Sequence, residues 1–377
     1  MLKVLTIVGT RPELIKMCRV IDRFDRHTRH VLVHTGQNYD YELNQVFFEN
    51  LGIRRPDHFL DAAGGSAAAT IARVVERADE TLAAEAPDAM LVYGDTNSAL
   101  AVLSAKRRKI PIFHMEAGNR CFDQRVPEEL NRKVVDHLSD INITITEHAR
   151  RYLLAEGLPA DRVFVLGSHL PEVFDTFRDQ IAAAAVLERL GLQPRGYFLV
   201  SAHREENVDD PARLAMLLDA LNGLADAEAK PVLVSTHPRT RARLEALEGV
   251  AIDPRVRFEK PFGFFDYVKL QMQAACVLSD SGTITEESAI LGFPAVTIRD
   301  THERPEGMDE GVLVMCGLGR ASVLPAVRLA MAAAGEQAAA RVPAYQGSDV
   351  SWKVLKLVTS YVPYVRERVW GLPPARG

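Results

Sequence analysis

The feature that most constrains the fold of this chain is a regular alternation between short apolar runs and longer segments with helical periodicity. The runs are rich in Val, Ile and Leu, and most of them lead directly into Gly, Ser, Thr or Asp. Such runs are typical of strands buried on both faces, and helices between them form the crossovers of a parallel sheet. The sequence therefore predicts an α/β fold.

The apolar runs form two series, separated by an alanine-rich helical stretch around residues 181–192. The first series comprises residues 3–8, 30–35, 89–94, 111–115, 141–146 and 163–167. The second comprises residues 197–202, 231–236, 256–260, 275–280 and 295–300. We expect each series to build one doubly wound, Rossmann-like domain, with the two domains facing each other across a cleft.

The length of 377 residues also favours two domains over one. Residues 350–370 carry apolar side chains at helical spacing, so we expect a C-terminal helix that packs back on the first domain. The expected first domain is 1–168 together with 355–377, and the second is 169–354.

Composition excludes several classes of protein. A net charge of −5 argues against nucleic acid as the main partner, and no apolar run is long enough for membrane insertion. The first apolar run meets Gly-Thr-Arg-Pro rather than a cleavage site, which indicates a buried strand. The cysteines show no paired spacing, so we expect no metal site, reduced thiols and a cytoplasmic location. They are Cys18, Cys121, Cys276 and Cys316.

A first candidate anion site is the segment GTRPE at residues 9–13, which follows the first run and opens a helix expected to reach about Phe24. Glycine lets the backbone turn, proline fits the first helical turn, and the free amides there attract anions. Arg11 and Lys16 add positive charge. Taken alone, the segment slightly favours a routine turn with a surface arginine.

The most highly charged stretch is HMEAGNRCFDQRVPEELNR at residues 114–132, with four carboxylates, three arginines and a histidine between two apolar runs. Ionisable groups at the carboxyl end of a strand are typical of an α/β active site. A solvated loop is the alternative. Within it, Glu128 and Arg132 are four residues apart, and an ion pair on one helical face also explains them.

Asp95 follows another apolar run, in the sequence GDTNS. Capping of the next helix is the commoner role of an Asp at such a position. Near Glu116 and Glu128, however, it would belong to a group of carboxylates that can be tuned into proton acceptor and donor.

In the second half, His203 and Arg204 follow one strand and His237 follows another. A structural histidine is the commoner case, but a His-Arg pair there can reach an anionic ligand. The turn at residues 279–287, SDSGTITEE, suits a diphosphate through its amides and hydroxyls, and a carboxylate further on suits ribose. A capping box with Ser281 or Thr283 as N-cap is a compatible alternative.

Six motifs, taken in order, resemble the non-hydrolysing UDP-N-acetylglucosamine 2-epimerases, and together they span nearly the whole chain. They are GTRPELIK from residue 9, GDTNS from 94, HMEAGNR with RVPEELNR from 114, SAHREEN from 201, SDSGTITEE from 279 and RDTHERPEG from 299. The resemblance implies a glycosyltransferase-B-like fold in which the second domain holds most of the UDP. It also implies a cytoplasmic homodimer that takes part in capsule or O-antigen synthesis.

The chemistry implied by the resemblance is inversion at C2 of a UDP-activated acetamido sugar. UDP is eliminated to give a 2-acetamidoglycal and is then added back, without a cofactor or a metal. The acid and base candidates are Asp95, Glu116 and Glu128, in roles that stay open, with His203 near the phosphates. The positions implied to bind UDP or line its cleft are Arg11, Lys16, Arg132, Arg204, His237, Ser281, Gly282 and Glu287.

The segment from Asn119 to Asp123 resembles the branch that makes UDP-N-acetyl-L-fucosamine from a 6-deoxy-L-talose-type sugar. An enzyme acting on UDP-diacetamido-uronic acids would look similar. The segment after Gln37 departs from that of members regulated by a second UDP-sugar, and Gln37, Arg204 and His237 are candidate remnants of such a site. The alternatives are a hydrolysing epimerase, a glycosyltransferase of the same fold, and a UDP-sugar sensor without turnover.

Overall fold

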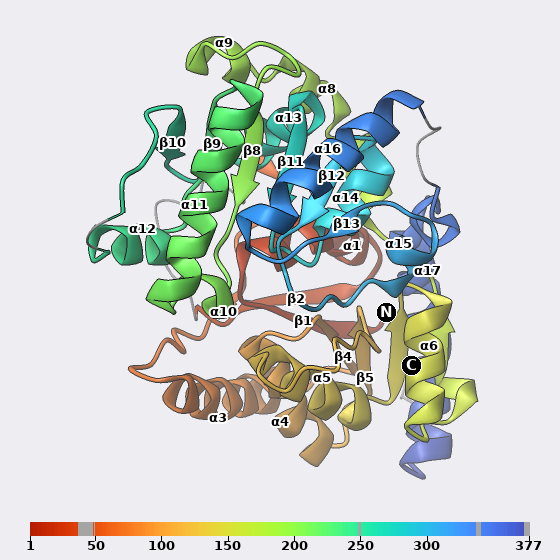
Figure 1. The fold of residues 1–377 in the computed structure, drawn as a ribbon. Helices are drawn as coiled ribbons and strands as arrows, with labels where there is room; N and C mark the ends of the chain where they lie inside the picture. The colour runs from red at the N-terminus through yellow and green to blue at the C-terminus, as the bar shows by residue number, and fades with distance from the viewer. Residues whose placement is uncertain (37–47, 49, 248–249, 337–340, 373–377) are drawn as a thin grey trace. The chain divides into compact units, whose positions relative to one another are not determined.

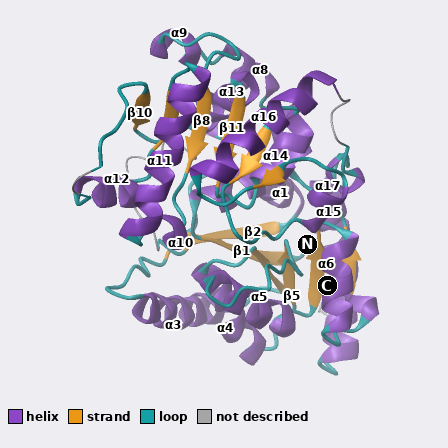
Figure 2. Cartoon of the chain, viewed as in Figure 1, coloured by secondary structure: helices purple, strands orange, loops and turns teal. Residues whose placement is uncertain are grey.

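The computed structural model describes residues 1–36, 48, 50–247, 250–336 and 341–372 (Figure 1). The chain divides into two compact units. Unit 1 consists of Met1–Val173 together with Gln346–Gly377, and unit 2 of Phe174–Tyr345. Each unit has a parallel sheet with helices on both faces, so the predicted α/β class is confirmed (Figure 2).

Unit 1 contains a seven-stranded parallel sheet in the order β3-β2-β1-β4-β5-β6-β7. Its strands are β1 (Lys3–Val8), β2 (Arg29–His34), β3 (His58–Phe59), β4 (Ala89–Tyr93), β5 (Ile112–Met115), β6 (Ile141–Thr144) and β7 (Val163–Val165). Its helices are α1 (Arg11–His27), α3 (Ala67–Glu85), α4 (Val102–Arg107), α5 (Pro127–Leu138), α6 (Glu147–Ala155) and α17 (Val350–Tyr364), and α7 (Leu170–Thr176) spans the boundary between the two units. Short helical turns are η1 (Asn97–Ala101), η2 (Ala160–Arg162) and the π-helical η4 (Val365–Val369).

Unit 2 repeats this plan in a six-stranded parallel sheet, in the order β10-β9-β8-β11-β12-β13. Its strands are β8 (Phe198–Ser201), β9 (Val232–Ser235), β10 (Val256–Glu259), β11 (Cys276–Ser279), β12 (Ala295–Thr297) and β13 (Val314–Met315). Its helices are α8 (Arg178–Ala183), α9 (Val186–Leu190), α10 (Glu205–Val208), α11 (Pro211–Glu228), α12 (Pro238–Glu245), α13 (Phe264–Gln273), α14 (Ile284–Leu291), α15 (Pro305–Asp309), α16 (Arg320–Glu336) and the turn η3 (Pro343–Tyr345).

The period of two along each strand divides the core between the two faces of a sheet. In β8, Phe198 and Val200 pack with α11 and α16 on one face, whereas Leu199 packs with Leu270 of α13 and Ile284 of α14 on the other. Both faces of the sheet are therefore buried at this strand. This explains why such strands are apolar throughout rather than alternating between apolar and polar residues.

The C-terminal helix belongs to unit 1, as predicted. The indole of Trp352 in α17 lies 4.9 Å from the ring of His27, and the guanidinium of Arg23 lies 4.1 Å from the same indole. The hydroxyl of Ser351 donates to Glu172 at 2.5 Å. The apolar face of α17 thus packs against α1, although it is distant in the sequence.

The order of strands reverses at one place in each sheet, between β1 and β4 in unit 1 and between β8 and β11 in unit 2. Ligands of doubly wound sheets bind outside the carboxyl ends of the strands at such a switch point. Arg11 and Asp95 follow the first pair of strands, and His203 and Ser281 follow the second pair. The topology therefore places four of the predicted site residues at the two switch points.

Candidate functional site

The turn after β1 presents Arg11 as the first residue of α1. Thr10 is the N-cap, and its hydroxyl accepts a hydrogen bond from the amide of Glu13 at 3.5 Å. Gly9 cannot carry a side chain there, because a Cβ would lie 1.9 Å from Oγ of Ser98. The predicted turn into a helix is confirmed, and Arg11 lies where the free amides of a helix start gather.

Asp95 lies in the turn after β4 and contacts an arginine from a different helix. Nε of Arg132 donates to Oδ2 of Asp95 at 2.7 Å, and Nδ2 of Asn131 donates to the carbonyl of Asp95 at 2.9 Å. The alternative that Asp95 caps the next helix is wrong. Thr96 is the N-cap, because its hydroxyl is placed to accept from the amide of Ser98 while the carboxylate of Asp95 is held by Arg132.

Glu116 follows β5 with a φ of 63°, a left-handed conformation that is uncommon for a side chain of this kind and is often found at functional sites. Nζ of Lys16 donates to Oε2 at 2.9 Å, and Nδ2 of Asn119 donates to Oε1 at 3.1 Å. The hydroxyl of Tyr93 contacts Oε2 and lies 3.2 Å from Nε2 of His169. The structure therefore joins Lys16 to Glu116 and adds Tyr93, which the sequence did not indicate.

Helix α5 carries Glu128 and Arg132, and between them the buried Glu129. Glu129 accepts from Nη1 of Arg132 at 2.8 Å and from the amides of Cys121 and Phe122 at 3.1 and 3.2 Å. Burial alone would raise the pKa of Glu129, but these donors hold it below its ordinary value. Glu128 is only partly buried, in the first turn. Arg132 is thus held by Glu129 and by the aspartate after β4.

A buried chain of charges lies behind these turns. Nδ1 of His114 lies 2.9 Å from Oδ1 of Asp136, and its Nε2 lies 2.8 Å from the carbonyl of Gly94. Arg120 donates to Asp136 at 2.7 Å and reaches both oxygens of Glu156, at 2.8 and 2.7 Å. Part of the charge in the stretch at 114–132 therefore serves the interior rather than a ligand. The sequence did not separate these two uses.

Glu13 is a buried carboxylate at the same switch point that the sequence did not single out. Its side chain is 4% exposed, and burial raises its pKa to about 7. Oε2 accepts from the amide of Gly9 at 2.6 Å, and Oε1 accepts from the hydroxyl of Thr96 at 2.6 Å. The sequence did carry one signal for Glu13, which lies in GTRPE within the first turn of a helix. A charged side chain that faces the interior there needs a hydrogen-bonding partner.

In unit 2, His203 is paired with the buried Asp280. Nδ1 of His203 lies 3.1 Å from Oδ1 of Asp280, whose Oδ2 accepts from the amides of His203 and Arg204 at 2.9 and 3.0 Å. Burial would raise the pKa of Asp280, but His203 and these donors lower it to about 2. The ring of His203 is 42% exposed, so burial opposes its charge only in part and Asp280 raises its pKa.

Arg204 lies beside the glycine of the SDSGTITEE turn. Its Nε donates to the carbonyl of Asp280 at 2.9 Å, and its Nη2 lies 3.6 Å from Oε1 of Glu303. A Cβ on Gly282 would lie 3.2 Å from Oε2 of Glu303 and 3.8 Å from Nη2 of Arg204. Gly282 therefore lies beside the ion pair of Arg204 and Glu303, with the carboxylate closer than the guanidinium.

The rest of this turn is ordered by hydroxyls. Oγ of Ser281 and Oγ1 of Thr283 lie 2.9 Å apart, and Thr283 donates to Oε1 of Glu287 at 2.7 Å. Nε2 of Gln271 donates to Oε2 of Glu287 at 2.6 Å. Thr283 is the N-cap of α14, as the alternative expected, but its hydroxyl donates to Glu287 and makes no capping hydrogen bond. Ser281, Gly282 and Glu287 are thus joined in one segment.

His237 follows β9, and its ring lies 6.3 Å from that of His203. The two histidines therefore share the same end of the unit 2 sheet, as their positions after strands predict. Gln37, the other candidate remnant of a regulatory site, lies outside the described residues, as does the segment that follows it.

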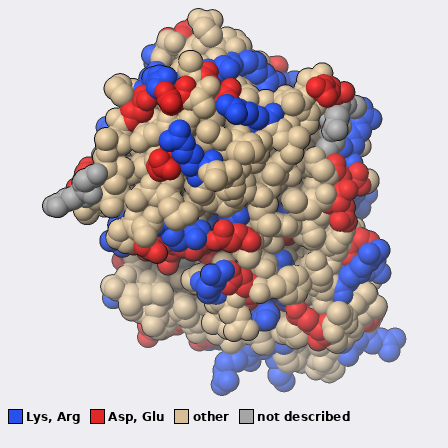
Figure 3. Space-filling view, viewed as in Figure 1, with Lys and Arg blue, Asp and Glu red and all other residues tan. Residues whose placement is uncertain are grey.

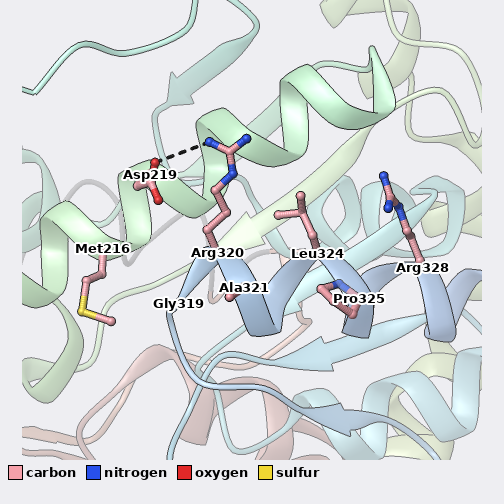
Figure 4. A pocket seen from close by; sticks show the side chains of 8 residues that line it. All are labelled: Met216, Asp219, Gly319, Arg320, Ala321, Leu324, Pro325 and Arg328. Carbon is pink, nitrogen blue, oxygen red and sulfur yellow. Dashed lines mark ion pairs between the residues drawn. The ribbon is translucent and has the colours of Figure 1, made fainter.

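A surface groove of about 690 Å³ lies between α11 and α16, and none of the predicted site residues that the structure describes lines it (Figure 4). Arg320 lies 3.6 Å from Asp219 there. The groove is lined by Met216, Asp219, Gly319, Arg320, Ala321, Leu324, Pro325 and Arg328. Asp219 is paired with Arg320, and the described residues that line the groove include no histidine, cysteine or second carboxylate.

Among the described residues, no group of three or more His, Cys, Asp or Glu side chains is placed to hold a metal ion. In the same part of the chain, no helix is both long and apolar enough to cross a membrane. On the face shown in Figure 3, many basic side chains lie next to acidic ones.

The chain is similar in fold to solved structures of UDP-N-acetylglucosamine 2-epimerases. The structure of UDP-N-acetylglucosamine 2-epimerase from Rickettsia bellii is 56% identical, with a TM-score of 0.92 over 98% of this chain and 100% of that chain. The enzyme of Methanocaldococcus jannaschii in complex with UDP-GlcNAc and UDP is 29% identical, with a TM-score of 0.88 over 95% and 99%.

Sequence comparison points the same way. A UDP-2,3-diacetamido-2,3-dideoxy-D-glucuronate 2-epimerase from Pseudomonas aeruginosa is 35% identical over 88% of this chain and 92% of its own length. The profile of the family described as UDP-N-acetylglucosamine 2-epimerase matches residues 22–359. The chain therefore belongs to the UDP-N-acetylglucosamine 2-epimerase family, a family of isomerases.

Proposed function

We propose that this chain inverts C2 of a UDP-activated acetamido sugar without hydrolysing it, by eliminating UDP and adding it back. The observation that carries the proposal is the division of chemistry between the two switch points. Carboxylates gather after β4 and β5 in unit 1, whereas a histidine paired with a buried aspartate and a hydroxyl-rich turn follow β8 and β11 in unit 2. Proton transfer and diphosphate binding need these two kinds of group.

In the proposed reaction, a carboxylate removes the proton at C2. The electron pair of that C–H bond forms the C1–C2 double bond, and the bond from C1 to the UDP oxygen breaks. A second group then delivers a proton to the opposite face of C2 while UDP returns to C1. Asp95, Glu116 and Glu128 are the candidates for the acid and the base. Arg132 orients Asp95, and Lys16 orients Glu116.

The departing diphosphate needs positive charge and hydrogen-bond donors as it gains negative charge. His203 is suited to this, because Asp280 holds Nδ1 and favours the cationic ring, leaving Nε2 as a donor. We propose that Arg11, Arg204, His237 and the turn at Ser281 and Gly282 also contact the phosphates. Glu287, held by Thr283 and Gln271, is the proposed partner of the ribose hydroxyls.

We propose that the substrate is UDP-GlcNAc or UDP-2-acetamido-2,6-dideoxy-L-talose. The solved relative with 56% identity carries the name of a UDP-N-acetylglucosamine 2-epimerase, which supports the first. The name of the Pseudomonas aeruginosa relative keeps a diacetamido-uronic acid as the alternative. A homodimeric state and a role in surface polysaccharide synthesis accompany this proposal as predictions.

The test is proton NMR of the purified protein with each of the three UDP-sugars in turn. We expect one of them to form its C2 epimer and reach an equilibrium mixture, with UDP remaining bonded to sugar. Stoichiometric release of UDP and free sugar would replace the proposal with a hydrolysing epimerase. Turnover only after an acceptor is added would indicate a glycosyltransferase, and tight binding without any turnover a sensor.

A further inference from the structure

The buried carboxylate of Glu13 has no part in the proposed chemistry, yet it joins the two turns of the unit 1 switch point. Its two oxygens accept from different segments, one from Gly9 after β1 and the other from Thr96 after β4, each at 2.6 Å. Charge-assisted hydrogen bonds of this length are stronger than neutral ones. One side chain therefore sets the spacing between the turns.

The two turns approach each other closely, which makes that spacing sensitive. A Cβ on Gly9 would lie 1.9 Å from Oγ of Ser98 and 2.3 Å from Oγ1 of Thr35. These two hydroxyls lie 2.7 Å apart. Because so little free volume remains, loss of the hydrogen bonds of Glu13 must shift the backbone of the turn after β1 or of the turn after β4.

Each linked turn carries a residue of the proposed site next to the linked atom. Arg11 is two residues after Gly9, and Asp95 is the residue before Thr96. The carboxylate of Asp95 is also held by Arg132 at 2.7 Å. Glu13 thus holds the residue next to Asp95, whereas Arg132 holds the carboxylate of Asp95 itself.

The charged group that faces Glu13 from another element is Asp95, which opposes its ionisation. On its own helix, Lys16 pairs with Glu116 at 2.9 Å. Both partners of Glu13 are donors, and an ionised carboxylate accepts from both, whereas a protonated one must use an oxygen as a donor. The link is therefore stronger when Glu13 is charged.

We propose that Glu13 is a positioning residue for proton transfer at C2, which ties the turn of Arg11 to the turn of Asp95 and does so most firmly in its ionised form. This inference rests on the proposed function. Because burial raises the pKa of Glu13 to about 7, the tie weakens as the pH falls through neutrality. His203 also has a raised pKa, so only a comparison of variants isolates the share of Glu13.

The test compares Glu13→Gln, Thr96→Val and Thr96→Ser with the wild-type protein, by the pH dependence of C2 epimerisation between pH 5 and 9. Glutamine keeps the size and one acceptor but no charge. In Glu13→Gln, we expect kcat/KM to fall by about tenfold to a hundredfold at pH 8. The part of the pH profile near pH 7 that reflects the titration of Glu13 should disappear. Thr96→Ser keeps the hydroxyl and should restore what Thr96→Val loses. Glu76→Gln, on the exposed face of α3, is the matched control and should leave the profile unchanged.

A second readout does not need turnover. Carboxyl ¹³C NMR of glutamate-labelled protein should show one resonance that titrates near pH 7 and vanishes in Glu13→Gln, with a higher midpoint in Thr96→Val. Lack of turnover in the wild type refutes the proposed function but leaves this titration readable. A Glu13→Gln profile that superimposes on the wild type after scaling, or no such resonance, overturns the inference.

Discussion

The pair formed by His203 and Asp280 offers a prediction whose size follows from the structure. Asp280 is fully buried and accepts from His203, Arg204 and Nδ2 of Asn207, the last at 3.1 Å. Its pKa falls from 3.8 to about 2, which corresponds to about 2 kcal/mol in favour of the folded, ionised form. Asp280→Asn removes this charge. It also replaces one carboxylate oxygen by an NH2 group, which cannot accept the hydrogen bonds donated to that position.

We therefore expect Asp280→Asn to lower the free energy of unfolding of unit 2 by about 2 kcal/mol or more at pH 7. The contribution of a carboxylate with a lowered pKa is present above about pH 4 and is lost as the pH falls toward 2. The difference between wild type and variant should therefore shrink below pH 4. The control is Asp219→Asn, whose side chain is 62% exposed and whose change should stay within about 0.5 kcal/mol.

The assay is urea unfolding followed by hydrogen exchange of peptides from β8 and β11, because both tryptophans lie in unit 1 and do not report on unit 2. Histidine NMR gives the second measurement. The pKa of His203 should lie above its ordinary value in the wild type and drop in the variant, since Asp280 is the group that raises it. An unchanged pKa of His203 together with unchanged unfolding would refute the reasoning.

Three further predictions concern the site and its packing. Glu116→Gln should reduce C2 inversion at least about a hundredfold in a steady-state assay, because it removes a proposed proton-transfer group. Ser281→Ala should weaken UDP binding about tenfold in calorimetry, since the diphosphate loses a hydroxyl, whereas Ser322→Ala on α16 should not. Gly307→Ala puts a Cβ 2.0 Å from Cγ2 of Thr285 and should cost about 1–3 kcal/mol in thermal unfolding. Adding Thr285→Ser, which lacks that methyl group, should recover most of the loss.

The sequence was sufficient to predict most strands of the two sheets, because helices cover both faces and the strands are apolar throughout. Every apolar run of the two series forms a parallel strand, and the missed strands are β3 and β13 at the sheet edges. Each has only two residues, and so short a segment shows no recognisable period. The alanine-rich helical stretch around 181–192 is divided between two helices, α8 and α9, because Ala184 has extended backbone angles.

The site was less predictable, because spacing along the chain does not reveal which charges meet. The spacing of Glu128 and Arg132 suggests an ion pair on one helical face, but it does not reveal that Arg132 also reaches Asp95, 37 residues earlier. His114 and Arg120 stand beside Glu116 in the sequence but belong to a buried network with Asp136. Only the fold separates charges that serve the interior from charges available to a ligand.

The most direct test of the central claim is turnover in deuterated water. If C2 is inverted by removal and return of a proton, both the epimer and the recovered substrate should gain one deuterium at C2, and mass spectrometry with NMR would locate it there. Inversion without deuterium at C2, or no deuterium in any of the three UDP-sugars, would contradict the account.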